Sequence, residues 1–275
     1  MHRQNHRRRR APNRGPRAPH ESPNRSGIHI LQDRSLVRRM VRSSGTEAGD
    51  LVMEFGAGPG ILTSALAATG ARVIAVERHT GFVARLERRF AEEPGVRVVG
   101  ADARTVMLPR RPYHVVANIP YSISTTLLRR LLDPRTTALA GADLIVEWGF
   151  AKRVTADVPR DLETAWWQVR FAMSIAERIP PESFRPAPAV DSAHLVIRRR
   201  ADVSNAAAHQ ARLMLQARYR SPRRPAKEIL AGHVTKKRAH RLLTSTGIDP
   251  PTEAAAVPTA MWVRLARELL RVNAR

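Results

Sequence analysis

The 275-residue chain has no cysteine, only 5% aromatic residues and no long apolar run. The lack of cysteine excludes disulfide scaffolds, cysteine-ligated zinc, iron–sulfur clusters and cysteine nucleophiles. No hydrophobic stretch approaches the ~20 residues that a membrane helix needs. The basic N-terminus lacks the apolar segment of a secretory signal. We therefore expect a cytoplasmic protein without a membrane partner.

Acidic residues are also scarce, since 24 Asp and Glu stand against 47 Lys and Arg, for a formal net charge of +23. The excess lies at the two ends of the chain. Residues 1–26 carry eight arginines against one glutamate and little that is apolar, which predicts a disordered basic tail. Residues 200–275 carry 15 basic and five acidic side chains. Such a charge favours a polyanionic partner, above all nucleic acid.

The middle of the chain alternates apolar runs with helix-forming segments. We expect strands at 51–55, 72–76, 96–99, 113–117 and 144–146, and two further β segments near 169–176 and 194–198. Helices are expected at 61–69, at 80–92 with Thr80 as the cap, and at 124–132. This alternation predicts an α/β fold with a mostly parallel, Rossmann-like sheet and helices on both faces. Such sheets bind ligands at the carboxyl ends of their strands.

The pattern changes after residue 200, where three helices are expected at 205–219, 236–245 and 259–271. We predict three parts: a disordered tail (1–26), an α/β domain (27–199) and a small α-helical C-terminal domain (200–275).

A glycine-rich loop follows the first strand, with Gly56, Gly58 and Gly60 directly after Glu54 and Phe55. Dinucleotide folds use Gly-x-Gly-x-x-Gly, so the closer spacing here disfavours a nicotinamide dehydrogenase. A carboxylate beside the loop suits a ligand with an ammonium group, such as S-adenosylmethionine. Taken alone, the loop is also compatible with a tight turn or another nucleotide site.

Two more acidic residues follow the next two strands. Glu77 can accept hydrogen bonds from both hydroxyls of a ribose, and Asp102 can accept one from an adenine amine. Either residue alone could be a solvated loop acid. Acids at three successive strand ends favour a shared site.

The tetrapeptide Asn118–Tyr121, Asn-Ile-Pro-Tyr, follows the fourth strand. Pro120 rigidifies the turn, and the Asn118 side-chain oxygen and Ile119 carbonyl can accept both protons of an adenine N6. These acceptors would stabilise the positive charge that develops on N6 when it acts as a nucleophile. Tyr121 can stack on a base taken out of its helix. On its own, the tetrapeptide could equally be an Asx turn with a core tyrosine.

In this order the motifs resemble the ribosomal RNA adenine N6-methyltransferases, over roughly residues 27–199. The resemblance implies a class I methyltransferase fold, S-adenosyl-L-methionine as cofactor, no metal, and a monomer. It implies cofactor contacts in three groups: His29, Leu31, Glu54, Gly56, Gly58 and Asn118 at the methionine part, Glu77 and Arg78 at the ribose, and Asp102 and Ala103 at the adenine.

Two further segments resemble family motifs. Residues 26–31 match an N-terminal motif at His29 and Leu31, but Ile28 and Ile30 replace the usual Gln and Phe. Residues 184–192 resemble a Phe-x-Pro-x-Pro-x-Val-Asp-Ser signature. That resemblance implies that Phe184 and Tyr121 sandwich the target adenine.

The family has two branches that could apply: the erythromycin-resistance (Erm) type, which methylates an adenine of 23S rRNA in the macrolide-binding region, and its sister branch, the 16S dimethyladenosine transferases. Three features resemble the Erm type: the Asn-Ile-Pro-Tyr sequence, the Trp-containing segment 146–153 and the Arg-rich tail. Naked or precursor 23S rRNA is then the expected substrate, and macrolide resistance the expected outcome. The alternatives are a 16S dimethyladenosine transferase, a DNA adenine methyltransferase and a non-catalytic nucleic-acid-binding homologue.

The basic residues of the C-terminal part are expected to contact RNA phosphates. They are Arg218, Arg220, Arg223, Arg224, Lys227, Lys236, Lys237, Arg238 and Arg241. The open alternative is a solvated helical surface.

Overall fold

The computed structural model describes residues 29–133 and 138–273. The tail predicted at 1–26 and the unusual Ile28 lie outside the described residues. Within the described part, no helix is long and apolar enough to cross a membrane.

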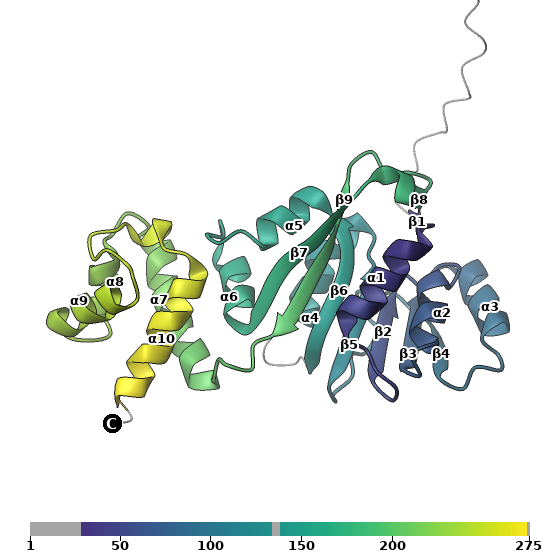
Figure 1. The fold of residues 1–275 in the computed structure, drawn as a ribbon, viewed down its shortest axis with the longest axis horizontal. Helices are drawn as coiled ribbons and strands as arrows, with labels where there is room; N and C mark the ends of the chain where they lie inside the picture. The colour runs from purple at the N-terminus through teal and green to yellow at the C-terminus, as the bar shows by residue number, and fades with distance from the viewer. Residues whose placement is uncertain (1–28, 134–137, 274–275) are drawn as a thin grey trace, which may run out of the picture.

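A seven-stranded sheet forms the centre of the molecule, in the order β4-β3-β2-β5-β6-β9-β7 (Figure 1). Its strands are β2 (Leu51–Phe55), β3 (Arg72–Glu77), β4 (Val96–Gly100), β5 (Tyr113–Asn118), β6 (Leu139–Glu147), β7 (Phe171–Ile179) and β9 (Ser192–Arg199). Strands β2 to β6 are parallel, while β9 is antiparallel to both β6 and β7. The prediction of a mostly parallel sheet is confirmed. The β segment expected at 169–176 begins later, at Phe171, because Val169 and Arg170 end a helix.

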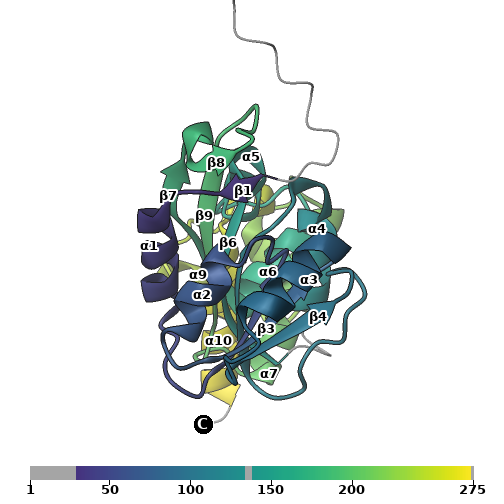
Figure 2. The ribbon, with the colours of Figure 1, turned by 90° about the vertical axis from the view of Figure 1, so that its right-hand side faces the viewer.

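Helices cover both faces of this sheet (Figure 2). They are α1 (Arg34–Ser44), α2 (Ile61–Ala67), α3 (Thr80–Arg89), α4 (Ser124–Leu131), α5 (Trp148–Val154) and α6 (Leu162–Arg170). Alternation along β2 explains the two layers, since Val52 packs in a core with α1 and α2 whereas Met53 packs in a core with α4 and α5. The predicted cap was wrong, because His79 precedes α3 and Thr80 is its first helical residue, without a side-chain cap.

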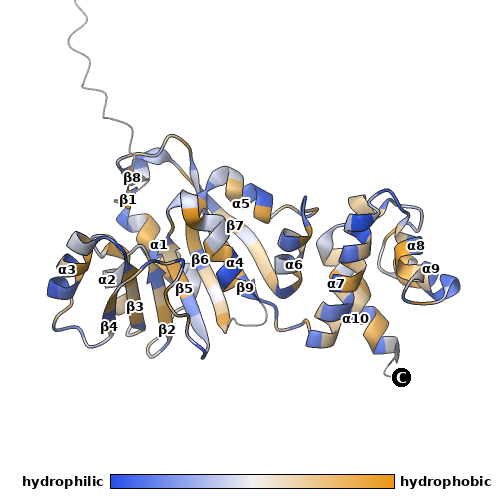
Figure 3. Ribbon diagram, turned by 180° about the vertical axis from the view of Figure 1, so that it is seen from behind, coloured by the Kyte–Doolittle hydropathy of each residue, from blue (hydrophilic) through white to orange (hydrophobic). Residues whose placement is uncertain are grey.

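The C-terminal part is helical and lies beyond β7 and α6 (Figure 1). It comprises α7 (Asn205–Arg220), α8 (Ala226–Ala231), α9 (Lys236–Ser245) and α10 (Thr259–Asn273). Both α7 and α10 carry hydrophobic residues interspersed with hydrophilic ones, as the strands of the sheet also do (Figure 3). These helices enclose their own hydrophobic cluster around Trp262, which also takes in Ala165 and Val169 of α6. The helical C-terminal region is therefore confirmed, while its boundary at residue 200 stays a prediction.

A small two-stranded sheet joins distant parts of the sequence beside the end of β5. Strand β1 (Ile30–Leu31) pairs antiparallel with β8 (Phe184–Arg185). The backbone N–H of Gln32 donates to the Ser183 carbonyl at 2.8 Å. This pairing brings the N-terminal motif against the Phe-Arg-Pro segment, and the Arg185–Pro186 peptide is cis.

Candidate active site

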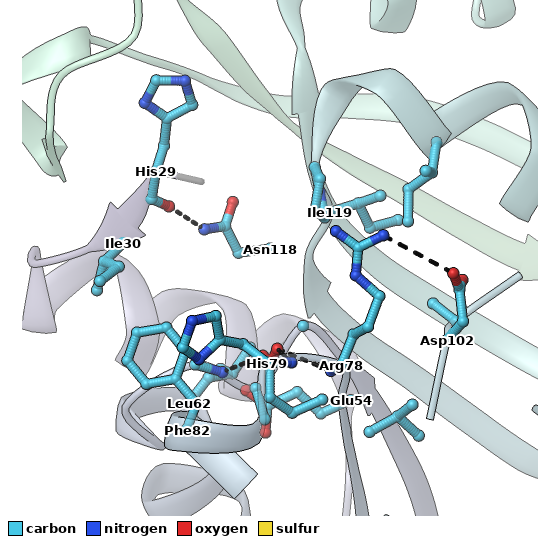
Figure 4. A pocket seen from close by; sticks show the side chains of 18 of the residues that line it. His29, Ile30, Glu54, Leu62, Arg78, His79, Phe82, Asp102, Asn118 and Ile119 are labelled. Carbon is cyan, nitrogen blue, oxygen red and sulfur yellow. Dashed lines mark hydrogen bonds and ion pairs between the residues drawn. The ribbon is translucent and has the colours of Figure 1, made fainter. Parts of the chain in front are cut away.

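A cavity of about 490 Å³ opens at the carboxyl ends of the parallel strands (Figure 4). Its volume lies within the range of small-molecule sites, roughly 300–1,000 Å³. Each residue predicted to contact a cofactor lines this cavity, from His29 and the glycine loop to Asp102, Ala103 and the Asn118–Tyr121 turn.

The glycine loop adopts a backbone that only glycine accepts easily. Gly56, Gly58 and Gly60 have φ values of 73°, 52° and 82°. A Cβ on Gly60 would lie 2.8 Å from the Leu86 Cδ2 atom, so the Leu86 side chain of α3 would have to shift to admit a larger residue. The loop lets backbone approach the cavity, and the Gly58 N–H donates to a Glu77 carboxylate oxygen at 2.9 Å.

Glu54 lies at the end of β2 and is only 2% exposed. It accepts a hydrogen bond from the Thr63 hydroxyl at 2.6 Å. Burial raises the pKa of this carboxyl to about 8, the charge of Glu77 adds to the rise, and the Thr63 bond opposes it. A bound cation would stabilise the charged form here, because Glu54 is a buried acid beside a second acid.

Backbone donors hold Glu77 in place at the end of β3. Its carboxylate accepts from the N–H groups of Gly58 at 2.9 Å, Arg78 at 2.8 Å and His79 at 2.7 Å. These bonds fix the direction of the carboxylate. Since one oxygen takes only the Gly58 bond, it retains capacity for a further donor.

Asp102, after β4, is engaged by arginine. The Arg104 guanidinium bonds both carboxylate oxygens, at 2.6 to 3.1 Å, and Arg78 lies 4.0 Å away. The hydrogen bonds from Arg104 hold the pKa of Asp102 at about 2. An adenine amine at this position would therefore compete with Arg104 for the carboxylate.

The Asn118 amide is oriented by the chain that precedes β1. Its Nδ2 donates to the His29 carbonyl at 2.7 Å (Figure 4). Among the described residues, the Asn118 Oδ1 has no hydrogen-bond partner. Ile119 is buried, and its N–H donates to the Ile145 carbonyl of β6 at 3.1 Å, which fixes the turn. The turn therefore presents an unused acceptor to the cavity.

Tyr121 is held by two contacts. Its hydroxyl shares a 2.6 Å hydrogen bond with the Ser192 hydroxyl at the start of β9. The His29 ring stacks beside it, with ring centres 5.8 Å apart and planes at 26°. Burial raises the pKa of the Tyr121 phenol. His29 is itself fixed, because its Nδ1 lies 2.8 Å from the Pro186 carbonyl.

Phe184 does not lie where the resemblance implied. Its side chain is 1% exposed and packs in the α1–α2 core with Leu31, Leu36 and Ile179. It does not line the cavity. The ring that stacks with Tyr121 is that of His29, and Phe184 anchors β8 to the hydrophobic core.

Seven of the nine basic residues predicted to bind RNA are exposed: Arg220, Arg223, Arg224, Lys227, Lys236, Lys237 and Arg241. Arg238 is half-buried and donates to the Leu269 carbonyl at 3.4 Å. Arg218 is not positioned to contact RNA as predicted, because it is only 4% exposed. It donates to the carbonyls of Ala254 and Ala255 at 3.1 and 3.0 Å. Its charge therefore stabilises the helical cluster and is not available to RNA.

The cavity also has walls that the motifs did not identify. Leu62, His79 and Phe82 form one of them, and Ser122 and Ile123 continue another (Figure 4). The signal was present in part, because these residues lie two to seven positions after the strand ends that were identified. The inward direction of Phe82, however, depends on how α3 packs.

Comparisons with known proteins agree with this geometry. The profile of the family described as Ribosomal RNA adenine dimethylase matches residues 20–270. An rRNA adenine N-6-methyltransferase of Bacillus licheniformis is 31% identical over 88% of this chain and 85% of the relative. The mycinamicin-resistance protein MyrB of Micromonospora griseorubida is 32% identical over 90% and 79% of the two chains.

The sister branch is represented at similar identity. Ribosomal RNA small subunit methyltransferase A of Phenylobacterium zucineum is 32% identical over 87% of this chain and 85% of the relative.

Among solved structures, the 23S rRNA methyltransferase ErmE superposes with a TM-score of 0.76 at 26% identity, covering 87% of this chain and 99% of that chain.

The fold is that of the class I methyltransferases, and the relatives confirm the resemblance to Erm-type enzymes that the motifs had indicated. The chain belongs to the ribosomal RNA adenine dimethylase family, a family of RNA methyltransferases.

Proposed function

We propose that this protein transfers methyl groups from S-adenosylmethionine to N6 of one adenine in the macrolide-binding region of 23S rRNA. It would do so as a cytoplasmic monomer on naked or precursor RNA, and the modification would give macrolide resistance. The observation that carries the proposal is the oriented Asn118–Tyr121 turn at the wall of a cavity that also presents three acids.

The cavity fits the cofactor in size and in its donors and acceptors. Glu54 is a buried acid that a cofactor ammonium would compensate, and Glu77 retains an acceptor for ribose hydroxyls. The glycine loop would lie against the methionine part, and Asp102 and Ala103 against the adenine. When bound, the cofactor supplies an electrophilic methyl group on a sulfonium.

The residues of the turn would act on the target adenine. The Oδ1 of Asn118 and the Ile119 carbonyl would accept the two N6 protons, which directs the nitrogen lone pair out of the ring plane. As the nitrogen becomes positive, these acceptors would stabilise the charge more strongly than they stabilise the substrate. The Tyr121 ring would hold the extruded base, with its hydroxyl fixed on Ser192.

The choice of 23S rRNA rests on three similarities. The mycinamicin-resistance relative and the ErmE structure favour 23S rRNA, as does the Asn-Ile-Pro-Tyr sequence. A 16S dimethyladenosine transferase is the second candidate, because the small-subunit relative is as similar in sequence.

Transfer of tritiated methyl groups from S-adenosylmethionine tests the proposal. Protein-free 23S rRNA and intact 30S subunits would be incubated separately, and primer extension would then cross the macrolide-site adenine. A stop at that adenine is expected. Label in 30S alone would favour the second candidate, and RNA binding without label in either would refute methyl transfer.

A further inference from the structure

An aromatic ring flanked by two cations lies next to the turn that holds Tyr121. Trp148 is the first residue of α5, directly after β6, and its backbone N–H donates to the Asp191 carbonyl at 3.0 Å. The next residue, Ser192, bonds the Tyr121 hydroxyl at 2.6 Å. The backbone of Trp148 is therefore connected to Tyr121 by two hydrogen bonds, through the consecutive residues Asp191 and Ser192.

Two basic side chains accompany this indole. The Arg178 guanidinium lies 5.1 Å from the ring centre, and the Lys152 ammonium lies 5.8 Å from it. Arg178 comes from β7, pairs with Asp191, and has a side chain that is 61% exposed. Lys152 is exposed one turn along α5, while Trp148 itself is half-buried against the sheet core.

A purely structural cation–aromatic pair occurs elsewhere in the chain for comparison. Trp166 of α6 carries the Arg212 guanidinium at 5.1 Å, and it packs against the hydrophobic cluster of the helical part. Trp148 differs in having two cations and in being connected to Tyr121. Packing alone does not explain why an indole with two cations lies at this position.

Extruding an adenine into the cavity breaks its stacking with the neighbouring nucleotides. A nucleotide beside the extruded base then needs a new partner for its exposed face. Aromatic rings and arginine planes are the groups that stack on unpaired RNA bases, and nearby cations bind the phosphates. Trp148, Arg178 and Lys152 supply these groups beside the cavity.

We propose that Trp148, Arg178 and Lys152 form a subsite for the nucleotide next to the target adenine. The base stacks on the indole and guanidinium, and its phosphate bonds to Lys152. This subsite rests on the proposed function, since it requires a single-stranded adenine in the cavity.

Leucine variants with a matched control test the subsite. Trp148→Leu keeps the apolar bulk and removes the aromatic face, Trp148→Phe restores a face, and Trp166→Leu makes the same change at the other arginine-covered tryptophan. RNA dissociation constants would be measured by fluorescence anisotropy with S-adenosylhomocysteine present, so that no turnover is needed. The RNA is a fragment of whichever ribosomal RNA is methylated, or fragments of both if neither is.

Trp148→Leu is expected to weaken RNA binding by about tenfold, within the range for loss of one base–aromatic stack. Trp148→Phe should recover most of this loss, and Trp166→Leu should change RNA binding little. Cofactor affinity, measured by calorimetry, should be unchanged in all three variants.

An abasic nucleotide beside the target adenine makes the test specific. Wild type should lose affinity for such RNA, while Trp148→Leu should lose nothing further, because the stack is already absent. Two results would overturn the subsite. One is equal RNA affinity of wild type and Trp148→Leu. The other is that the losses of affinity caused by Trp148→Leu and by the abasic nucleotide add, whichever side of the adenine the abasic nucleotide lies on. Failure of methyl transfer alone would refute the proposed function and leave this comparison valid.

Discussion

Replacing Glu54 by glutamine should stabilise the cofactor-free protein at neutral pH. The folded carboxyl keeps its proton up to about pH 8, whereas the same group ordinarily releases it near 4.5. Between these values the folded state binds more protons than the unfolded state, so the free energy of unfolding falls as pH rises. Glutamine has the same shape, can accept the Thr63 hydrogen bond, and does not ionise.

The size of the effect follows from the difference in pKa. Each unit corresponds to about 1.4 kcal/mol, so the ionisable carboxyl costs roughly 3 kcal/mol of stability at pH 7 and almost nothing at pH 4.5. Glu54→Gln should therefore gain up to that amount at pH 7, with little gain at pH 4.5. The same variant should bind S-adenosylhomocysteine more weakly, because the cofactor ammonium loses its counterion.

Urea unfolding of both proteins, without cofactor and at pH values from 4.5 to 8, measures the difference directly. Glu92→Gln changes an exposed glutamate between α3 and β4, and it controls for the general effect of removing a carboxyl. A difference between wild type and Glu54→Gln that stays constant with pH would refute the assignment of a buried, protonated carboxyl. Calorimetric titration completes the test, since unchanged cofactor affinity would remove Glu54 from the binding site.

Four further predictions follow from the site and the core. Asn118→Ala should lower the rate of methyl transfer by about 100-fold or more while RNA affinity changes little; parallel losses of rate and RNA affinity would contradict its role. Arg104→Ala should raise the pKa of Asp102 from about 2 towards its ordinary value and tighten cofactor binding several-fold, as NMR titration and calorimetry would measure. Phe184→Ala should cost about 3–5 kcal/mol of stability by chemical denaturation, the range for a buried phenylalanine; a loss of activity at unchanged stability would restore the base-sandwich role. Arg218→Ala should lower the free energy of unfolding by roughly 3 kcal/mol, since two charge-assisted bonds are lost, and a variant of native stability with weakened RNA binding would contradict that.

The main sheet and the site at its edge could be predicted from sequence because the signals are local. Apolar runs followed by Gly, Glu, Asp or Asn marked β2, β3, β4 and β5 within a residue or two of their ends. The parallel arrangement then required these ends to meet at one edge.

Features that depend on tertiary packing could not be predicted in this way. Phe184 lies in a motif, and nothing in its sequence neighbourhood indicates that β8 turns the ring into the α1 core. Arg218 has basic neighbours that are exposed, and the carbonyls that it bonds belong to Ala254 and Ala255, 36 and 37 residues further along the chain. The stacking of His29 on Tyr121 joins residues from the start and the middle of the α/β part.

Helix α6 precedes the last two strands of the sheet in the chain, yet it packs with α7 and α10 in the helical part. Ala165 and Val169 are fully buried in that cluster. A cut at residue 199 would expose this face of α6 while leaving the helix attached to β7. The two parts are therefore coupled in folding, and thermal unfolding should show one cooperative transition rather than independent melting of a sheet and a helical appendage.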